Sequence, residues 1–119
     1  MPEQMTSRLI TLALLVTLVL TLVIGHLTLS PNLDSGVPGS DKAHHFLAFF
    51  ALVLPVSFAR PRLAMWITLA AVAYGGAIEL IQPYVGRDRD FMDFLADSAG
   101  AVSGMIAGLA LNSLCTRRA

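Results

Sequence analysis

The stretch "IELIQPYVGRDRDFMDFLAD", residues 78–97, joins two apolar segments and holds much of the charge of this chain. The 119-residue protein has eight Lys and Arg and eight Asp and Glu, and seven of these charged residues lie between Glu79 and Asp97. Charge concentrated at the ends of apolar segments predicts a protein in which several helix ends meet at one place.

The remainder of the chain is strongly apolar. It is 55% hydrophobic and 13% charged, whereas a soluble domain of this length needs a far more polar surface. Because about 20 helical residues cross the roughly 30 Å apolar core of a bilayer, each apolar segment is long enough to span one. The sequence therefore predicts one all-α domain, residues 1–119, folded as an integral membrane four-helix bundle. Its helices are expected at about 9–29, 41–59, 63–82 and 91–114.

The first apolar segment, residues 9–29, has an alternative interpretation as a secretory signal peptide. Its only basic flank is Arg8, its apolar run is long, and "GHLTLSP" (25–31) is a poor small-residue cleavage site. These features favour a membrane anchor that stays part of the protein.

Basic residues predict which helix ends face the cytoplasm, because short cytoplasmic loops are enriched in Lys and Arg. Alternating helices place both termini and the second loop on one side, and the first and third loops on the other. The first side has Arg8, Arg60, Arg62, Arg117 and Arg118, and the second has Lys42, Arg87 and Arg89. This bias predicts that both termini lie in the cytoplasm.

The last helix carries a pattern that defines one of its faces. Asp90, Asp93, Asp97, Gly100, Gly104 and Gly108 follow one another at steps of three or four residues. Such steps put side chains on one face of a helix, and a stripe of glycines lets another helix approach closely. We therefore expect the three glycines to be helix-packing residues and Asp93 and Asp97 to face protein. Asp90, at the start of the helix, is expected to be its N-cap.

Polar residues at three predicted helix ends form the candidate site. A charge at the centre of a membrane helix costs about 2.5–3.5 kcal/mol on insertion scales, so such groups normally face the protein interior and pair. The predicted ligand-binding residues are Asp41, Lys42, His45, Glu79, Gln82, Arg87, Asp93 and Asp97. Lys42 and Arg87 are expected to hold an anionic group. The alternative is a purely structural ion-pair network of Glu79, Arg87 and Asp93.

Catalysis is a second interpretation of the same residues. His45 is a candidate general base, with Glu79 or Asp93 as its acid partner. Neither a nucleophilic Ser or Cys nor an HExxH-like metal motif is evident, and Cys115 is the single cysteine. No metal or cofactor is therefore predicted. The formal net charge of zero gives no basic field for nucleic acid.

Two motifs resemble the VanZ-like family of small bacterial membrane proteins. They are "DKAHHFLAFF" (41–50) and "ELIQPYVGRDRDFMDFLADSAGAVSG" (79–104). The family pattern is similar to D-K-x-x-H-F, then E-x-x-Q, G-R, D and N-x-x-G before a glycine-rich helix. One position departs from this pattern, because Asp97 stands where the family usually has Asn.

The resemblance implies a multi-pass protein of the bacterial inner membrane that acts on the cell envelope. The family is named for a protein associated with resistance to teicoplanin, an antibiotic that binds peptidoglycan precursors. We therefore expect an outward-facing pocket for a polar head group of a phospholipid or of a lipid-linked cell-wall precursor. Alternatives are an intramembrane acid–base hydrolase or transferase, and a structural subunit that docks on another envelope protein or on its own copy through the glycine stripe.

Overall fold

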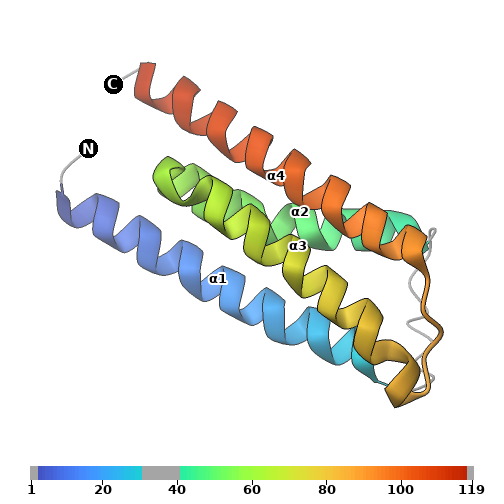
Figure 1. Ribbon diagram of the computed structural model, residues 1–119. Helices are drawn as coiled ribbons and strands as arrows, with labels where there is room; N and C mark the ends of the chain where they lie inside the picture. The colour runs from blue at the N-terminus through green and yellow to red at the C-terminus, as the bar shows by residue number, and fades with distance from the viewer. Residues whose placement is uncertain (1–2, 31–40, 118–119) are drawn as a thin grey trace.

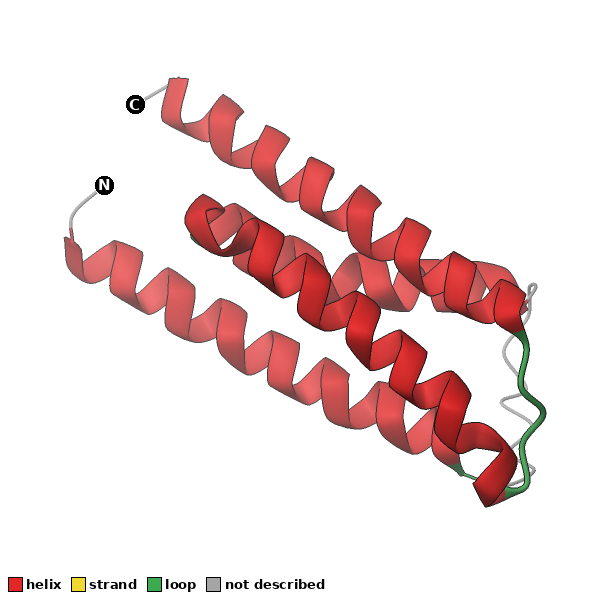
Figure 2. Ribbon diagram, viewed as in Figure 1, coloured by secondary structure: helices red, strands yellow, loops and turns green. Residues whose placement is uncertain are grey.

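The computed structural model describes residues 3–30 and 41–117 of the chain. Within these ranges all regular structure is helical (Figure 2). The long helices are α1 (Glu3–Leu29), α2 (Asp41–Ala59), α3 (Ala64–Ile81) and α4 (Phe91–Arg117). Two short 3₁₀ helices, η1 (Pro61–Leu63) and η2 (Gln82–Val85), stand before and after α3.

The four long helices form an antiparallel bundle (Figure 1). α1 begins and α4 ends at one end of it, whereas α3 ends close to the starts of α2 and α4 at the other end. Each of the four long helices is long and apolar enough to cross a membrane by length and composition. The prediction of an all-helical protein with four membrane-length helices is confirmed in this form.

The helix boundaries differ modestly from those predicted. α2 has the expected bounds, but α1 begins at Glu3 and α4 continues to Arg117. Both extensions are more polar than the predicted spans, so an apolar pattern alone does not reveal them. α3 ends at Ile81, one residue before its predicted end, and Gln82 begins η2 instead. Pro83 lies in the first turn of η2, where no amide donor is needed.

The closest helix contact joins α2 and α4, and the glycine stripe makes it possible. A Cβ built on Gly104 would lie 2.5 Å from the carbonyl oxygen of Phe50, and one on Gly108 would lie 2.7 Å from that of Leu54. Gly100 meets the backbone of Phe46 more closely still. Since α2 covers the stripe, these glycines do not offer a docking face to a partner protein.

Apolar side chains fill the space between all four helices. One cluster of buried residues contains Ile24 of α1, Phe49, Leu52 and Val53 of α2, Ala71 and Ile78 of α3, and Ala101 of α4. A second cluster, nearer the start of α1, contains Ile10, Ala13, Val56 and Ala59. The outward faces are also apolar, with Trp66 70% and Leu22 65% exposed, as expected of helices surrounded by lipid.

Several hydroxyl groups within the helices bond to backbone carbonyls. Thr68 donates to the carbonyl of Ala64 one turn earlier, at 2.7 Å. Between helices, Tyr74 of α3 donates to the carbonyl of Thr21 in α1 at 2.6 Å. Apolar surroundings offer no water to these groups, so each bond removes a donor that would otherwise be costly to bury.

Gly104→Ala should destabilise the bundle by about 1–3 kcal/mol, because the new methyl group would meet backbone that cannot rotate away. Gly76→Ala is the matched control, since its Cβ would lie 3.4 Å from the ring of Phe94 in ordinary contact. Thermal unfolding of both variants in detergent, followed by circular dichroism, measures the difference. Equal stability of the two variants would contradict the close α2–α4 contact.

Candidate functional site

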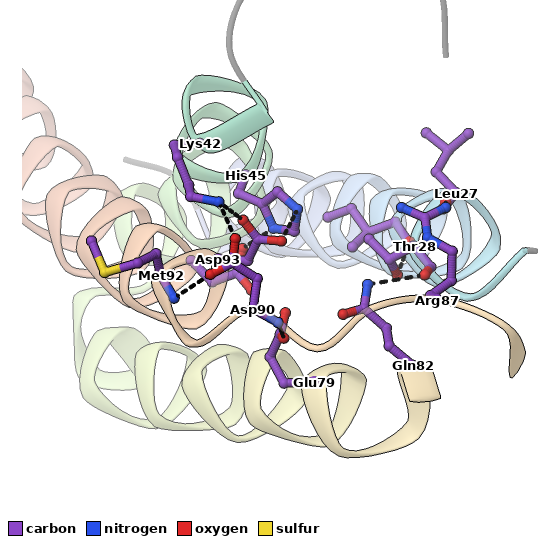
Figure 3. Close-up of polar contacts among 12 residues, drawn as sticks. Leu27, Thr28, Lys42, His45, Glu79, Gln82, Arg87, Asp90, Met92 and Asp93 are labelled. Atoms are coloured by element: carbon purple, nitrogen blue, oxygen red, sulfur yellow. Dashed lines mark hydrogen bonds and ion pairs between the residues drawn. The ribbon is translucent and has the colours of Figure 1, made fainter. Parts of the chain in front are cut away.

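Six ionisable side chains gather where α2 and α4 begin and α3 ends. All of them except Asp97 are labelled in Figure 3. We call this group the polar cluster. Its members are Lys42 and His45 of α2, Glu79 of α3, Asp90 just before α4, and Asp93 and Asp97 of α4. The antiparallel arrangement produces the cluster, because it brings the first turns of two helices to the last turn of a third.

Lys42 forms the exposed rim of the polar cluster with Asp90. Its ammonium nitrogen lies 2.6 Å from Asp90 Oδ2 and 2.5 Å from Asp93 Oδ1. The side chains of Lys42 and Asp90 are 43% and 45% exposed, whereas that of Asp93 is 9% exposed. Solvent thus reaches the cluster from the Lys42 side, and Asp93 lies in its buried part, which we call the floor of the cluster.

The carboxylate of Asp90 accepts two hydrogen bonds, one from Lys42 and one from the start of α4. Its Oδ2 accepts the bond from Lys42, and its Oδ1 accepts a bond from the backbone amide of Met92 at 2.9 Å, which caps the start of α4. The N-cap role was predicted from the sequence and is confirmed. The hydrogen bond from Lys42 first, and that from Met92 second, lower the pKa of Asp90 below its ordinary value.

His45 lies between two carboxylates of α4. Its Nδ1 is 2.7 Å from Asp97 Oδ1, and its Nε2 is 3.6 Å from Asp93 Oδ2. His45 is buried and Asp97 is fully buried. The second carboxylate oxygen of Asp97 faces Gly75 of α3, where a Cβ would lie only 3.0 Å away. The absent side chain of Gly75 therefore makes room for Asp97.

The Asp97 contact bears on the departure from the family pattern. The carboxylate oxygen that meets His45 Nδ1 could be replaced by the carbonyl oxygen of an Asn, which also accepts a hydrogen bond. The contact with His45 is thus compatible with either residue, and the change from Asn to Asp adds negative charge to the floor.

Glu79 closes the cluster on the α3 side. Its Oε2 accepts a bond from the backbone amide of Asp90 at 2.9 Å, and its backbone carbonyl accepts one from Arg89 Nε at 3.2 Å. Its Oε1 is buried and has no hydrogen-bond partner within residues 3–30 and 41–117. A buried acceptor without a donor is costly, and it indicates a position where a further donor would bind favourably.

Gln82 and Arg87 lie apart from the polar cluster, against the end of α1 (Figure 3). Gln82 Nε2 donates to the carbonyl of Thr28 at 3.1 Å. Arg87 Nη1 reaches the carbonyls of Leu27 and Ser30 at 3.3 and 3.1 Å. These carbonyls lie in the last turn of α1 and at Ser30, which follows it. The last carbonyls of a helix have no amide donor within the helix, and this end of a helix favours positive charge. We call this pair the α1 clasp.

The turn between α3 and α4 gives Arg87 its direction. Gly86 ends η2 with a positive φ of 79°, a left-handed conformation that glycine adopts without strain. The amide of Arg87 then bonds back to the carbonyl of Gln82 at 2.9 Å. The turn thus directs Arg87 toward α1, away from Lys42, so the two cations do not enclose one anion site.

The predicted ligand-binding residues accordingly separate into two groups. Lys42, His45, Glu79, Asp93 and Asp97 meet in the polar cluster, and Gln82 and Arg87 form the α1 clasp. Asp41 begins α2, but its side chain lies outside the described part of the structure. Sequence reasoning missed the contact of Asp90 with Lys42, although Asp90 shares a helix face with Asp93 at a step of three residues.

The chemistry of the polar cluster is dominated by acids. Four carboxyl groups surround a single lysine and a single histidine, and Lys42 is already bonded to two of the carboxylates. Such surroundings favour a ligand that donates hydrogen bonds or carries positive charge. Among the described residues, no group of three or more His, Cys, Asp and Glu side chains is arranged to hold a metal ion.

Comparisons with models of protein families, with curated proteins and with solved structures found no match to this chain. The functional argument therefore depends on the geometry of the polar cluster and on its residue types.

Asp90→Asn should make the stability of the protein less dependent on pH. The pKa of Asp90 is lowered in the folded state, so its carboxylate stabilises the fold above its ordinary pKa of 3.8, and this contribution is lost as the pH falls through the folded-state value. Asn keeps a capping oxygen for α4 but removes the charge. Thermal unfolding at pH 6, 4 and 3 should show a stability difference from the wild type that shrinks with falling pH. Asp88→Asn, an exposed change in the same turn, is the control. A pH-independent difference would refute the role assigned to Asp90.

Proposed function

We propose that this chain is a multi-pass protein of a bacterial inner membrane that binds the polar head group of an envelope lipid in its polar cluster. The lipid is a phospholipid or a lipid-linked cell-wall precursor, and the setting is that of the VanZ-like family, which the motifs at 41–50 and 79–104 resemble. In this proposal both termini are cytoplasmic, and the polar cluster opens on the outer side.

The observation that carries the proposal is the buried Oε1 atom of Glu79, which lacks a donor within the described chain. A purely structural network would satisfy such an atom, because an unsatisfied buried acceptor destabilises the fold. Glu79 and Asp93 are both buried, while Lys42 gives the rim access to solvent. A head group that displaces Lys42 from Asp93 would reach both carboxylates.

The excess of acids decides which head group fits best. An ammonium group offers three donors and a positive charge to carboxylates, so an ethanolamine or amino-sugar head group complements Glu79 and Asp93. An anion held jointly by Lys42 and Arg87, as expected from the sequence, fits this geometry less well. Lys42 is bonded to aspartates, and Arg87 is bonded to α1.

Native mass spectrometry of gently extracted protein tests the head-group site. Wild type should retain phosphatidylethanolamine over phosphatidylcholine with the same acyl chains, because methylation removes the ammonium donors. Glu79→Gln and Asp93→Asn should each weaken this retention about tenfold or more, since a hydrogen bond to a charged group contributes about 1.5–3 kcal/mol.

Asp88→Asn, which lies outside the polar cluster, should bind as the wild type does. Circular dichroism must first show that every variant has the wild-type helix content. Identical retention of both lipids by the wild type and the Glu79 and Asp93 variants would leave the cluster as a structural network and refute the proposal.

An intramembrane acid–base enzyme is the second candidate, and the position of His45 favours it. Because each of its ring nitrogens faces a carboxylate, the imidazole can take a proton on one side and release one on the other. No Ser or Cys side chain belongs to the polar cluster, so water would be the attacking group in a hydrolysis.

His45→Gln separates the two candidates. If the protein is a hydrolase, the substitution should abolish release of head group from bound lipid, measured by mass spectrometry of the products, while Glu79-dependent lipid retention persists. Absence of any turnover in the wild type across pH 5–9, with a lipid-linked precursor and with phospholipids, would leave binding as the function.

A further inference from the structure

An apolar groove runs along the outside of the bundle between α3 and the start of α4. It has a volume of about 490 Å³, within the roughly 300–1,000 Å³ of typical ligand sites. Its apolar lining comes from Ala73, Gly76, Ala77 and Leu80 of α3 and from Phe91 and Phe94 of α4. Glu79 and Arg89 complete the lining at the end of α3, so the groove and the polar cluster adjoin at Glu79.

Residue size explains the shape of the groove. Small residues, Ala73, Gly76 and Ala77, form the α3 wall, and the rings of Phe91 and Phe94 form the α4 wall with their centroids 5.9 Å apart. Gly76 brings the two walls together at the ring of Phe94. Open to the outside and almost purely apolar, the groove has the polarity of a site for a hydrocarbon chain.

Arg89 marks the polar end of the groove. Its Nε donates to the carbonyl of Glu79 at 3.2 Å, which fixes the guanidinium group at the end of α3. Arg89 is exposed and forms no ion pair with another described residue. Its terminal nitrogens are therefore free to form a paired hydrogen bond with a phosphate, for which the planar guanidinium group is well suited.

We propose that this groove binds an anionic phospholipid, with one acyl chain between α3 and α4 and the phosphate on Arg89. The positive charge at one end and the apolar walls along the rest match the two parts of such a lipid. The occupant is a lipid because the groove opens on the outer surface of membrane-length helices, where exposed side chains such as Leu80 and Phe91 are apolar.

The proposed lipid site adjoins the head-group site at Glu79, but the two sites bind their ligands through different groups. The carboxylate of Glu79 bonds to the backbone of Asp90 inside the cluster, and only the backbone carbonyl of Glu79 contacts Arg89. The ligands also differ in charge, because the polar cluster favours a cationic head group and the groove favours an anionic one. The tests of the two sites change different residues, so failure of one proposal can be told from failure of the other.

Photo-crosslinking locates the acyl chain. Wild-type protein in bilayer nanodiscs receives phosphatidylglycerol with a diazirine on one acyl chain, and the labelled peptides are identified by mass spectrometry. Labels should concentrate on residues 73–80 and 91–94. Labels spread evenly over the outward faces of all four helices would mean ordinary solvation by lipid and would overturn the proposal.

Two pairs of variants test the parts of the site by native mass spectrometry. Arg89→Gln should reduce the preference for phosphatidylglycerol over phosphatidylcholine several-fold, while Arg62→Gln, an exposed arginine at the opposite end, should keep it. Ala77→Phe should fill the groove and lower retention of phosphatidylglycerol, whereas Ala70→Phe, on an exposed part of α3 outside the groove, should not.

Each half of the proposal can be refuted separately. An unchanged lipid preference in Arg89→Gln would show that the phosphate does not bind Arg89. Unchanged lipid retention in Ala77→Phe would show that the acyl chain does not lie in the groove. The crosslinking pattern uses wild-type protein, so it remains decisive if a variant does not fold.

Discussion

The close approach of α2 and α4 is the constraint on which the rest of the structure depends. Gly100, Gly104 and Gly108 bring the two helix backbones into contact over three successive turns. At this separation the side chains one and two turns further along, toward the start of α4, can meet directly. His45 reaches Asp97, and Lys42 reaches Asp93. With a larger residue in the stripe the same polar groups would be too far apart to bond, and the cost of their burial would not be offset.

α1 is held by different means from the α2–α4 pair. Its apolar side chains pack into both core clusters, and its last turn is bound by Gln82 and Arg87. The turn from Gln82 to Asp90 thus serves both sides of the bundle, since one of its ends binds α1 and the other binds Lys42 and caps α4. Much of the chain's charge lies in residues 78–97 because this one segment connects all four helices.

The parts of this fold that could be predicted from the sequence are those set by composition and helical period. Apolar length was sufficient for the four helices, and steps of three and four residues placed Asp93, Asp97 and the glycines on one face of α4. The direction of Arg87 could not be predicted, because it depends on the left-handed conformation of Gly86 and on where α1 ends. The groove could not be predicted either, since small residues of α3 and rings of α4 form it only when packed together.

The most extensive helix contact has a consequence for the order of assembly. α2 and α4 pack together more than any other pair, yet α3 separates them along the chain. When a chain is made from its N-terminus, α2 therefore lacks its main partner until both α3 and α4 have been made. Before that point only contacts among α1, α2 and α3 can form, so the glycine contact and the burial of His45 belong to the last stage of folding. A chain truncated before α4 would leave Lys42 and His45 without Asp93 and Asp97, their acidic partners in α4.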